Sequence, residues 1–81
     1  MIAIPISDVI HTRALPVGAA AKIDGTWLVR CPQCREVFSL AQHHVDADGR
    51  ISPSIICPIR VGDHVCGWHE TAQLVRQKRH F

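Results

Sequence analysis

The chain has 81 residues, a formal net charge of +2 and a pI near 8.5, so we expect one domain with a mild basic bias. A charged fraction of 20% excludes a disordered polyelectrolyte. No apolar stretch approaches the roughly 18 residues that a membrane-spanning helix needs. We expect no signal peptide, because Pro5 and Asp8 interrupt the N-terminal apolar run and no basic segment precedes it, and we therefore expect a cytoplasmic protein.

Residues 1–18 predict an extended N-terminal arm, which Pro5 and Pro16 interrupt. The spacing of Ile2, Ile4 and Ile6 is the alternation of a β-strand, and we place this strand at an edge. Such an arm either covers a small core or offers a strand to a partner. We favour the covering role.

The next segment predicts a hairpin that leads into a metal-binding turn. An Asp-Gly pair separates two β-prone runs, residues 20–23 and 26–30. The second run ends at Cys31, which forms a C-x-x-C pair with Cys34. In such a turn both thiolates point inward and the following backbone amides donate to the sulfurs, which suits two of the four ligands of a tetrahedral Zn²⁺.

The middle of the chain predicts further short strands. We expect a strand at 36–38, then one helical turn from Ser39, where the spacing matches a capping box. Residues 46–49 predict a plain turn, and residues 50–56 a strand whose proline places it at an edge or a bulge. The C-terminal segment from His69 fits two structures: a last strand through Val75, which we favour, or a helix from Glu70 with Leu74 and Val75 on one face.

A second cysteine group completes the predicted metal site. Cys57 is followed by proline and Cys66 by glycine, and residues 59–65 between them are interpreted as an enlarged knuckle loop. His69 follows Cys66 at C-x-x-H spacing, so a shell of Cys31, Cys34, Cys66 and His69 is the alternative to the four-cysteine shell, and His64 is a weaker candidate. We favour Cys31, Cys34, Cys57 and Cys66, because four thiolates in one small domain usually bind one metal.

The cysteine motifs also carry a resemblance to a group of known proteins. The patterns Cys-Pro-x-Cys, Asp-Gly-x-Ile-x-Pro-Ser-Ile-x-Cys-Pro and Cys-Gly-Trp-His lie within about residues 27–75. Together they resemble small phage and prophage proteins with a zinc-ribbon core. The resemblance implies a metal-stabilised β fold and a phage setting, and no particular activity.

These observations predict a small, mainly-β zinc ribbon, in which β-hairpins and two knuckles surround one structural zinc ion. We expect a single domain with an N-terminal arm at 1–18, a ribbon core at 19–75 and a basic tail at 76–81. An enzyme is not expected, because four protein ligands leave no coordination position for water or substrate.

Two functions remain open at this stage. The favoured one is a protein-binding module, an inhibitor or adaptor of a host defence or transcription complex in the host cytoplasm, which uses the arm at 1–10 and the loop at 59–65. The alternative is a nucleic-acid-binding ribbon. Its candidate cations are Arg30, Arg35, Arg60 and the tail residues Arg76, Lys78 and Arg79, and its candidate stacking residues are Trp27, Phe38 and Trp68. The low net charge favours a protein partner.

Overall fold

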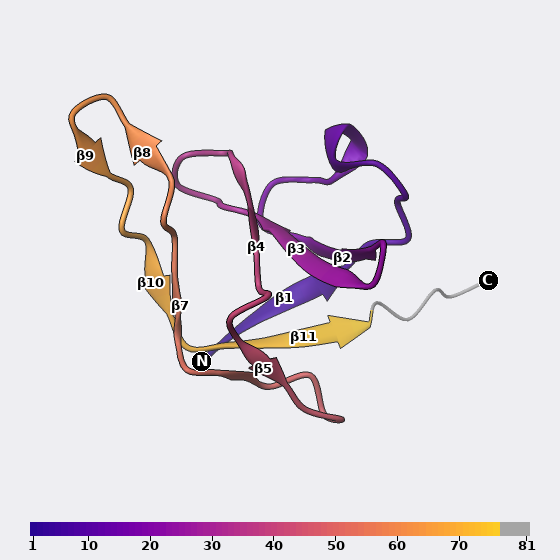
Figure 1. Cartoon of the computed structure of the whole chain (residues 1–81). Coiled ribbons are helices and arrows are strands. Elements are labelled where there is room, and N and C mark those ends of the chain that lie inside the picture. The colour runs from indigo at the N-terminus through magenta and orange to yellow at the C-terminus, as the bar shows by residue number, and fades with distance from the viewer. Residues whose placement is uncertain (77–81) are drawn as a thin grey trace.

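The computed structural model describes residues 1–76, which form short β-strands and one brief 3-10 helix, η1 at Thr12–Ala14 (Figure 1). The main sheet has five strands in the order β11-β1-β2-β3-β4. In that order they span Ala72–Arg76, Ile2–Ile6, Ala20–Ile23, Thr26–Arg30 and Val37–Ser39. The expectation of a small, mainly-β protein is confirmed.

Three two-stranded ribbons accompany this sheet. They are β5–β6 (His44–Val45 and Ile51–Ser52), β7–β10 (Ile55–Ile56 and His69–Glu70) and β8–β9 (Arg60–Val61 and His64–Val65). In Figure 1 the β8–β9 hairpin extends beyond β7 and β10, away from the main sheet. The segment predicted as an enlarged loop is therefore an ordered hairpin.

The β2–β3 hairpin forms as the sequence predicts. The two strands pair antiparallel, from Ala20 opposite Val29 to Ile23 opposite Thr26. Asp24 and Gly25 have φ angles of 52° and 80°, so both turn residues adopt the left-handed backbone that a two-residue hairpin of this kind requires.

The prediction that the first strand lies at an edge was wrong. β1 lies inside the main sheet, parallel to β11 along its whole length and parallel to β2 at Ile6. The Ile2 N–H donates toward β11 (to Thr71 O, 2.9 Å), while the Ser7 N–H donates toward β2 (to Ala20 O, 2.7 Å). The alternation of a strand therefore turns Pro5 toward the β2 side, where β1 is not yet paired and no donor is needed.

The rest of the arm covers the second face of the sheet, as expected for a covering segment. Leu15, Ala19 and Ala21 form a small buried cluster there. The Arg30 side chain attaches this segment to the first cysteine turn, because its guanidinium donates to the backbone oxygens of Leu15 (2.6 Å), Thr12 (2.7 Å) and Arg35 (2.7 Å).

The middle of the chain departs from the prediction in two places. The segment after Ser39 forms a single tight turn with a His43 N–H···O Leu40 bond of 2.9 Å, and not a helical turn. The run predicted as one strand is divided at the cis Ser52–Pro53 bond into β6 and β7. After Ser39, the Ala41 N–H donates to Ser39 Oγ (3.0 Å), and this local bond replaces regular backbone pairing. Between β6 and β7, a proline interrupts the pairing.

The C-terminal strand and the turn before β6 agree with the prediction. Residues after Trp68 form β10 and β11 and no helix up to residue 76. In the turn, the Asp46 carboxylate accepts the N–H groups of Asp48 (3.0 Å) and Arg50 (2.9 Å). This turn packs against β11, because the Leu74 N–H donates to Gly49 O (2.7 Å).

The main core joins the sheet to the cysteine turns. Its buried members include Ile4, Val29 and Ile55 together with Cys31 and Cys57. Several of the other buried positions are alanines, so the apolar area per residue is small. A core of this size usually needs a metal or another cross-link, and here two of the cysteines are part of it.

Candidate metal centre

The structure brings the four cysteines together from two distant parts of the chain. Cys31 and Cys34 follow β3, Cys57 follows β7 and Cys66 follows β9. All four Sγ atoms lie within 4.8 Å of one another. Cys31 and Cys57 are fully buried, whereas Cys34 and Cys66 are half-buried. The group could therefore hold one metal ion at the border between core and surface.

The distances between sulfur atoms fit a tetrahedral ion. Cys31 and Cys66 have their sulfurs 3.8 Å apart, and Cys34 and Cys57 have theirs 3.7 Å apart. A disulfide would require about 2.05 Å. Metal–sulfur bonds of about 2.3 Å in a regular tetrahedron place the sulfurs about 3.8 Å apart. These two pairs match that edge length, and all four sulfurs lie within 4.8 Å of one another, which is compatible with a single tetrahedral ion.

The two cysteine turns share one pattern of hydrogen bonds. In the first, the Cys31 N–H donates to Glu36 O (2.8 Å) and the Arg35 N–H donates to Cys31 O (2.8 Å). In the second, the Cys57 N–H donates to Trp68 O (2.8 Å) and the Gly67 N–H donates to Cys57 O (3.2 Å). In each group, the backbone of the first cysteine therefore bonds to the first and second residues that follow the second cysteine. The turns are therefore the same local structure used twice.

The second turn differs only by an inserted hairpin. The Cys66 N–H donates to Ile59 O (2.7 Å), which closes the base of β8–β9. Residues 60–65 extend from that base and are all exposed. The wide spacing between Cys57 and Cys66 therefore does not disturb the position of either ligand.

Both turns place a left-handed residue directly after the second cysteine. Gly67 has a φ of 69°, and Arg35 has a φ of 67° at the equivalent position. A residue with a Cβ pays about 1–2 kcal/mol for this conformation, and glycine does not. We therefore expect Arg35→Gly to stabilise the protein.

We expect Arg35→Gly to raise the free energy of unfolding by about 0.5–1 kcal/mol. This is less than the backbone strain that glycine removes, because glycine also gives the unfolded chain more conformational freedom. Urea unfolding of the metal-loaded protein measures it. The bond from Arg30 to the Arg35 carbonyl oxygen is a backbone contact and survives the change. A loss of stability would mean that the Arg35 side chain makes a contribution larger than its backbone strain.

Burial and backbone amides act in opposite directions on the thiols. Burial raises the pKa of Cys57 to about 12 and also raises the pKa of Cys34. At Cys31 burial is outweighed by donation from the N–H groups of Cys34 (3.5 Å) and Gln33 (3.4 Å), so the pKa is lowered. A metal must therefore displace protons from Cys34 and Cys57 when it binds, and its affinity falls as the pH is lowered.

The histidines named as alternative ligands lie outside this group. The His69 imidazole forms a 2.6 Å hydrogen bond between its Nε2 and Ser54 Oγ. His64 lies in β9 on the exposed hairpin. The described chain contains a group of three or more candidate ligands only at the four cysteines.

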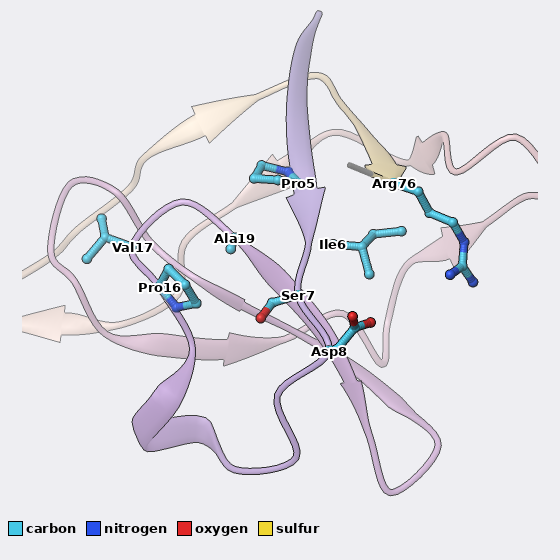
Figure 2. A pocket seen from close by; sticks show the side chains of 8 residues that line it. All are labelled: Pro5, Ile6, Ser7, Asp8, Pro16, Val17, Ala19 and Arg76. Atoms are coloured by element: carbon cyan, nitrogen blue, oxygen red, sulfur yellow. The ribbon is translucent and has the colours of Figure 1, made fainter. Parts of the chain in front are cut away.

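Other predicted site residues are dispersed. Arg76 is exposed at the end of β11, and Lys78 and Arg79 lie outside the described residues. Arg76 borders a hollow of about 280 Å³ beside the C-terminal end of β1. Figure 2 shows that prolines and aliphatic side chains form much of its lining. Its charged members, Asp8 and Arg76, are both exposed.

One residue of the site was not predicted from the sequence. The Gln33 side chain reaches from the first cysteine turn to the second, where its Nε2 donates to Cys66 O (3.1 Å) and to Cys66 Sγ (3.5 Å). In the sequence Gln33 is only the variable position of C-x-x-C. No local pattern could have revealed the contact, because its partner is far along the chain.

Comparisons with known proteins identify no relative of this chain. The sequence matches no family model, and neither the curated proteins nor the solved structures contain a significant match. Within residues 1–76, no helix has the length and apolar character that crossing a membrane requires.

Proposed function

We propose that this chain is a zinc ribbon in which Cys31, Cys34, Cys57 and Cys66 bind one structural Zn²⁺. The observation that carries the proposal is the group of four sulfurs within 4.8 Å of one another, held by two turns with the same hydrogen bonds. An all-thiolate tetrahedral set is typical of structural zinc. Because all four positions are taken by protein, the ion stabilises the fold and does not activate water.

We further propose that the ribbon acts as a non-enzymatic protein-binding module through the β8–β9 hairpin. Val61 is 41% exposed and Val65 is 47% exposed. Val61 pairs with His64 and Val65 with Arg60, so each face of the hairpin presents one exposed valine. Exposed apolar side chains on a projecting element favour contact with another protein. The Cys66 N–H···O Ile59 bond closes the base of the hairpin on the cysteine turn, and such preorganisation reduces the entropy lost on binding. An inhibitor or adaptor encoded by a phage could present such an element to a host complex.

Nucleic-acid binding is the second candidate, and the contacts of its proposed residues weigh against it. The Arg30 guanidinium donates to three backbone oxygens of its own chain. Phe38 is buried, and Trp27 and Trp68 pack against the main core. These aromatic side chains stabilise the fold, so they offer little surface for stacking on bases.

The hairpin proposal is tested with a double variant, Val61→Asp with Val65→Asp. We expect it to lose at least tenfold in affinity for a partner recovered from nuclease-treated bacterial lysate, because each face of the hairpin would carry a new charge in place of its exposed valine. The matched control is Ala14→Asp with Val17→Asp, which places two charges at exposed apolar positions outside both the arm at 1–10 and the hairpin. The control should bind as the unmodified protein does.

Two results would contradict the proposal. Equal binding by both double variants would remove the hairpin from the interface. Recovery of nucleic acid alone, with steep dependence on salt and loss on nuclease treatment, would favour the nucleic-acid reading.

A further inference from the structure

We propose that Gln33 is a positioning residue that locks Cys66 onto the metal and so determines how readily the ion is released. The inference rests on the proposed zinc site and concerns a residue that is not a ligand. Gln33 bridges the two cysteine turns with a side-chain amide, donating to both the carbonyl oxygen and the sulfur of Cys66. Its effect therefore falls on one particular ligand.

Cys66 differs from the other ligands in the source of its hydrogen bond. Backbone amides donate to the sulfurs of the other three: Gln33 and Cys34 to Cys31, Glu36 to Cys34, and Ile59 to Cys57. These donors belong to the turns themselves and persist in any side-chain variant. The donor at Cys66 is a side chain from the opposite turn, and a single substitution can remove it.

The position of Cys66 makes that bond important for metal release. Its side chain is half-buried, and the residue directly follows the exposed β8–β9 hairpin. A chelator or an electrophile reaches Cys66 and the equally half-buried Cys34 before it reaches the buried Cys31 or Cys57. Cys34 keeps its backbone donor from Glu36 in any side-chain variant, whereas Cys66 does not. An N–H···S bond withdraws charge from the thiolate and lowers its reactivity, while the bond to Cys66 O holds the backbone in place. Loss of Gln33 should therefore open the site at Cys66 first.

The direct test is Gln33→Glu, which replaces the donating NH₂ group by a carboxylate oxygen of nearly the same size. We expect zinc transfer to a competing chelator to become about 10- to 100-fold faster, because losing a hydrogen-bond partner of a metal ligand usually lowers metal affinity by that factor and the loss should fall on release. Gln33→Leu removes the donor without adding charge and should give a smaller effect in the same direction. Gln42→Glu is the charge-matched control at an exposed turn position and should leave the rate unchanged.

A second readout identifies the ligand concerned. With Co²⁺ as the probe, the thiolate-to-metal absorption reports whether all four sulfurs remain bound, and alkylation followed by mass spectrometry reports which cysteine reacts first. We expect Cys66 to be alkylated first, and faster in Gln33→Glu than in the unmodified protein. Unchanged release and alkylation in both Gln33 variants would overturn the inference. Failure of the unmodified protein to bind Zn²⁺ or Co²⁺ would instead overturn the proposed metal site.

Discussion

Cys57→Ser is expected to abolish zinc binding and leave the chain unfolded. The Cys57 side chain is fully buried, where its sulfur lies 3.7 Å from that of Cys34. Serine offers a poor, neutral ligand in place of a thiolate. Structural zinc contributes about 10 kcal/mol or more of apparent binding free energy, which is as large as the whole stability of a typical small domain. Removing one ligand should therefore remove most of the fold.

Far-UV circular dichroism and the zinc content per chain measure this outcome. Excess EDTA added to the unmodified protein should produce the same loss of structure, because metal binding and folding are coupled in such domains. A Cys57→Ser protein that stayed folded with one zinc per chain would contradict the four-cysteine site.

His69→Gln is the matched variant that separates the two ligand sets considered from the sequence. The His69 ring bonds to Ser54 in the described structure, and a glutamine can still supply a polar group there. We expect one zinc per chain and a stability loss of about 1 kcal/mol or less, the cost of one exposed hydrogen bond. Loss of zinc in this variant would instead indicate the Cys₃His shell.

Gly49→Ala is expected to destabilise the metal-loaded protein by roughly 3 kcal/mol or more, since backbone strain and steric overlap add. Gly49 has a φ of 85°, in the left-handed region. A Cβ built on it would overlap the carbonyl oxygen of Leu74 in β11, which is backbone and cannot turn aside. The change would push the turn at residues 46–49 off the edge of the sheet and strain the bond from the Leu74 N–H to Gly49 O.

Gly62→Ala provides the control for the steric part of this effect. Gly62 has a φ of 62° at the tip of β8–β9, and a Cβ there meets no atom within 4 Å. The Gly62→Ala variant should lose only about 1 kcal/mol of unfolding free energy, which is the cost of the backbone strain alone. Urea unfolding of both variants gives the difference, and equal losses would show that the turn moves freely away from β11.

The local parts of the fold could be predicted from the sequence. The Asp-Gly turn between β2 and β3 requires left-handed residues, and the chain supplies them at Asp24 and Gly25. The C-x-x-C turn likewise depends on a few neighbouring residues. By contrast, the helical turn predicted after Ser39 was wrong, because capping-box spacing is shared by tight turns that a side-chain bond closes.

The choice between Cys57 and His69 could not be made from spacing. Both residues stand at plausible distances along the chain from Cys66. In the structure the pairing of β7 with β10 sets His69 opposite Ile56 and turns its ring toward Ser54. Cys57 meanwhile enters the core beside Cys31. The choice between Cys57 and His69 as the fourth ligand therefore depends on the register of β7 against β10, which the sequence spacing does not reveal.

What the sequence by itself determined is the C-x-x-C turn of Cys31 and Cys34, the hairpin that leads into it and the β-rich character of the chain, because each depends on residues close together in the sequence. Tertiary structure alone decided that β1 lies inside the sheet, since its partner β11 comes from the other end of the chain. It also decided that Gln33 reaches Cys66 and that the long second loop is a projecting hairpin. Alternation of apolar residues indicates a strand, but the neighbours of that strand are chosen by contacts between distant segments, which no local pattern encodes.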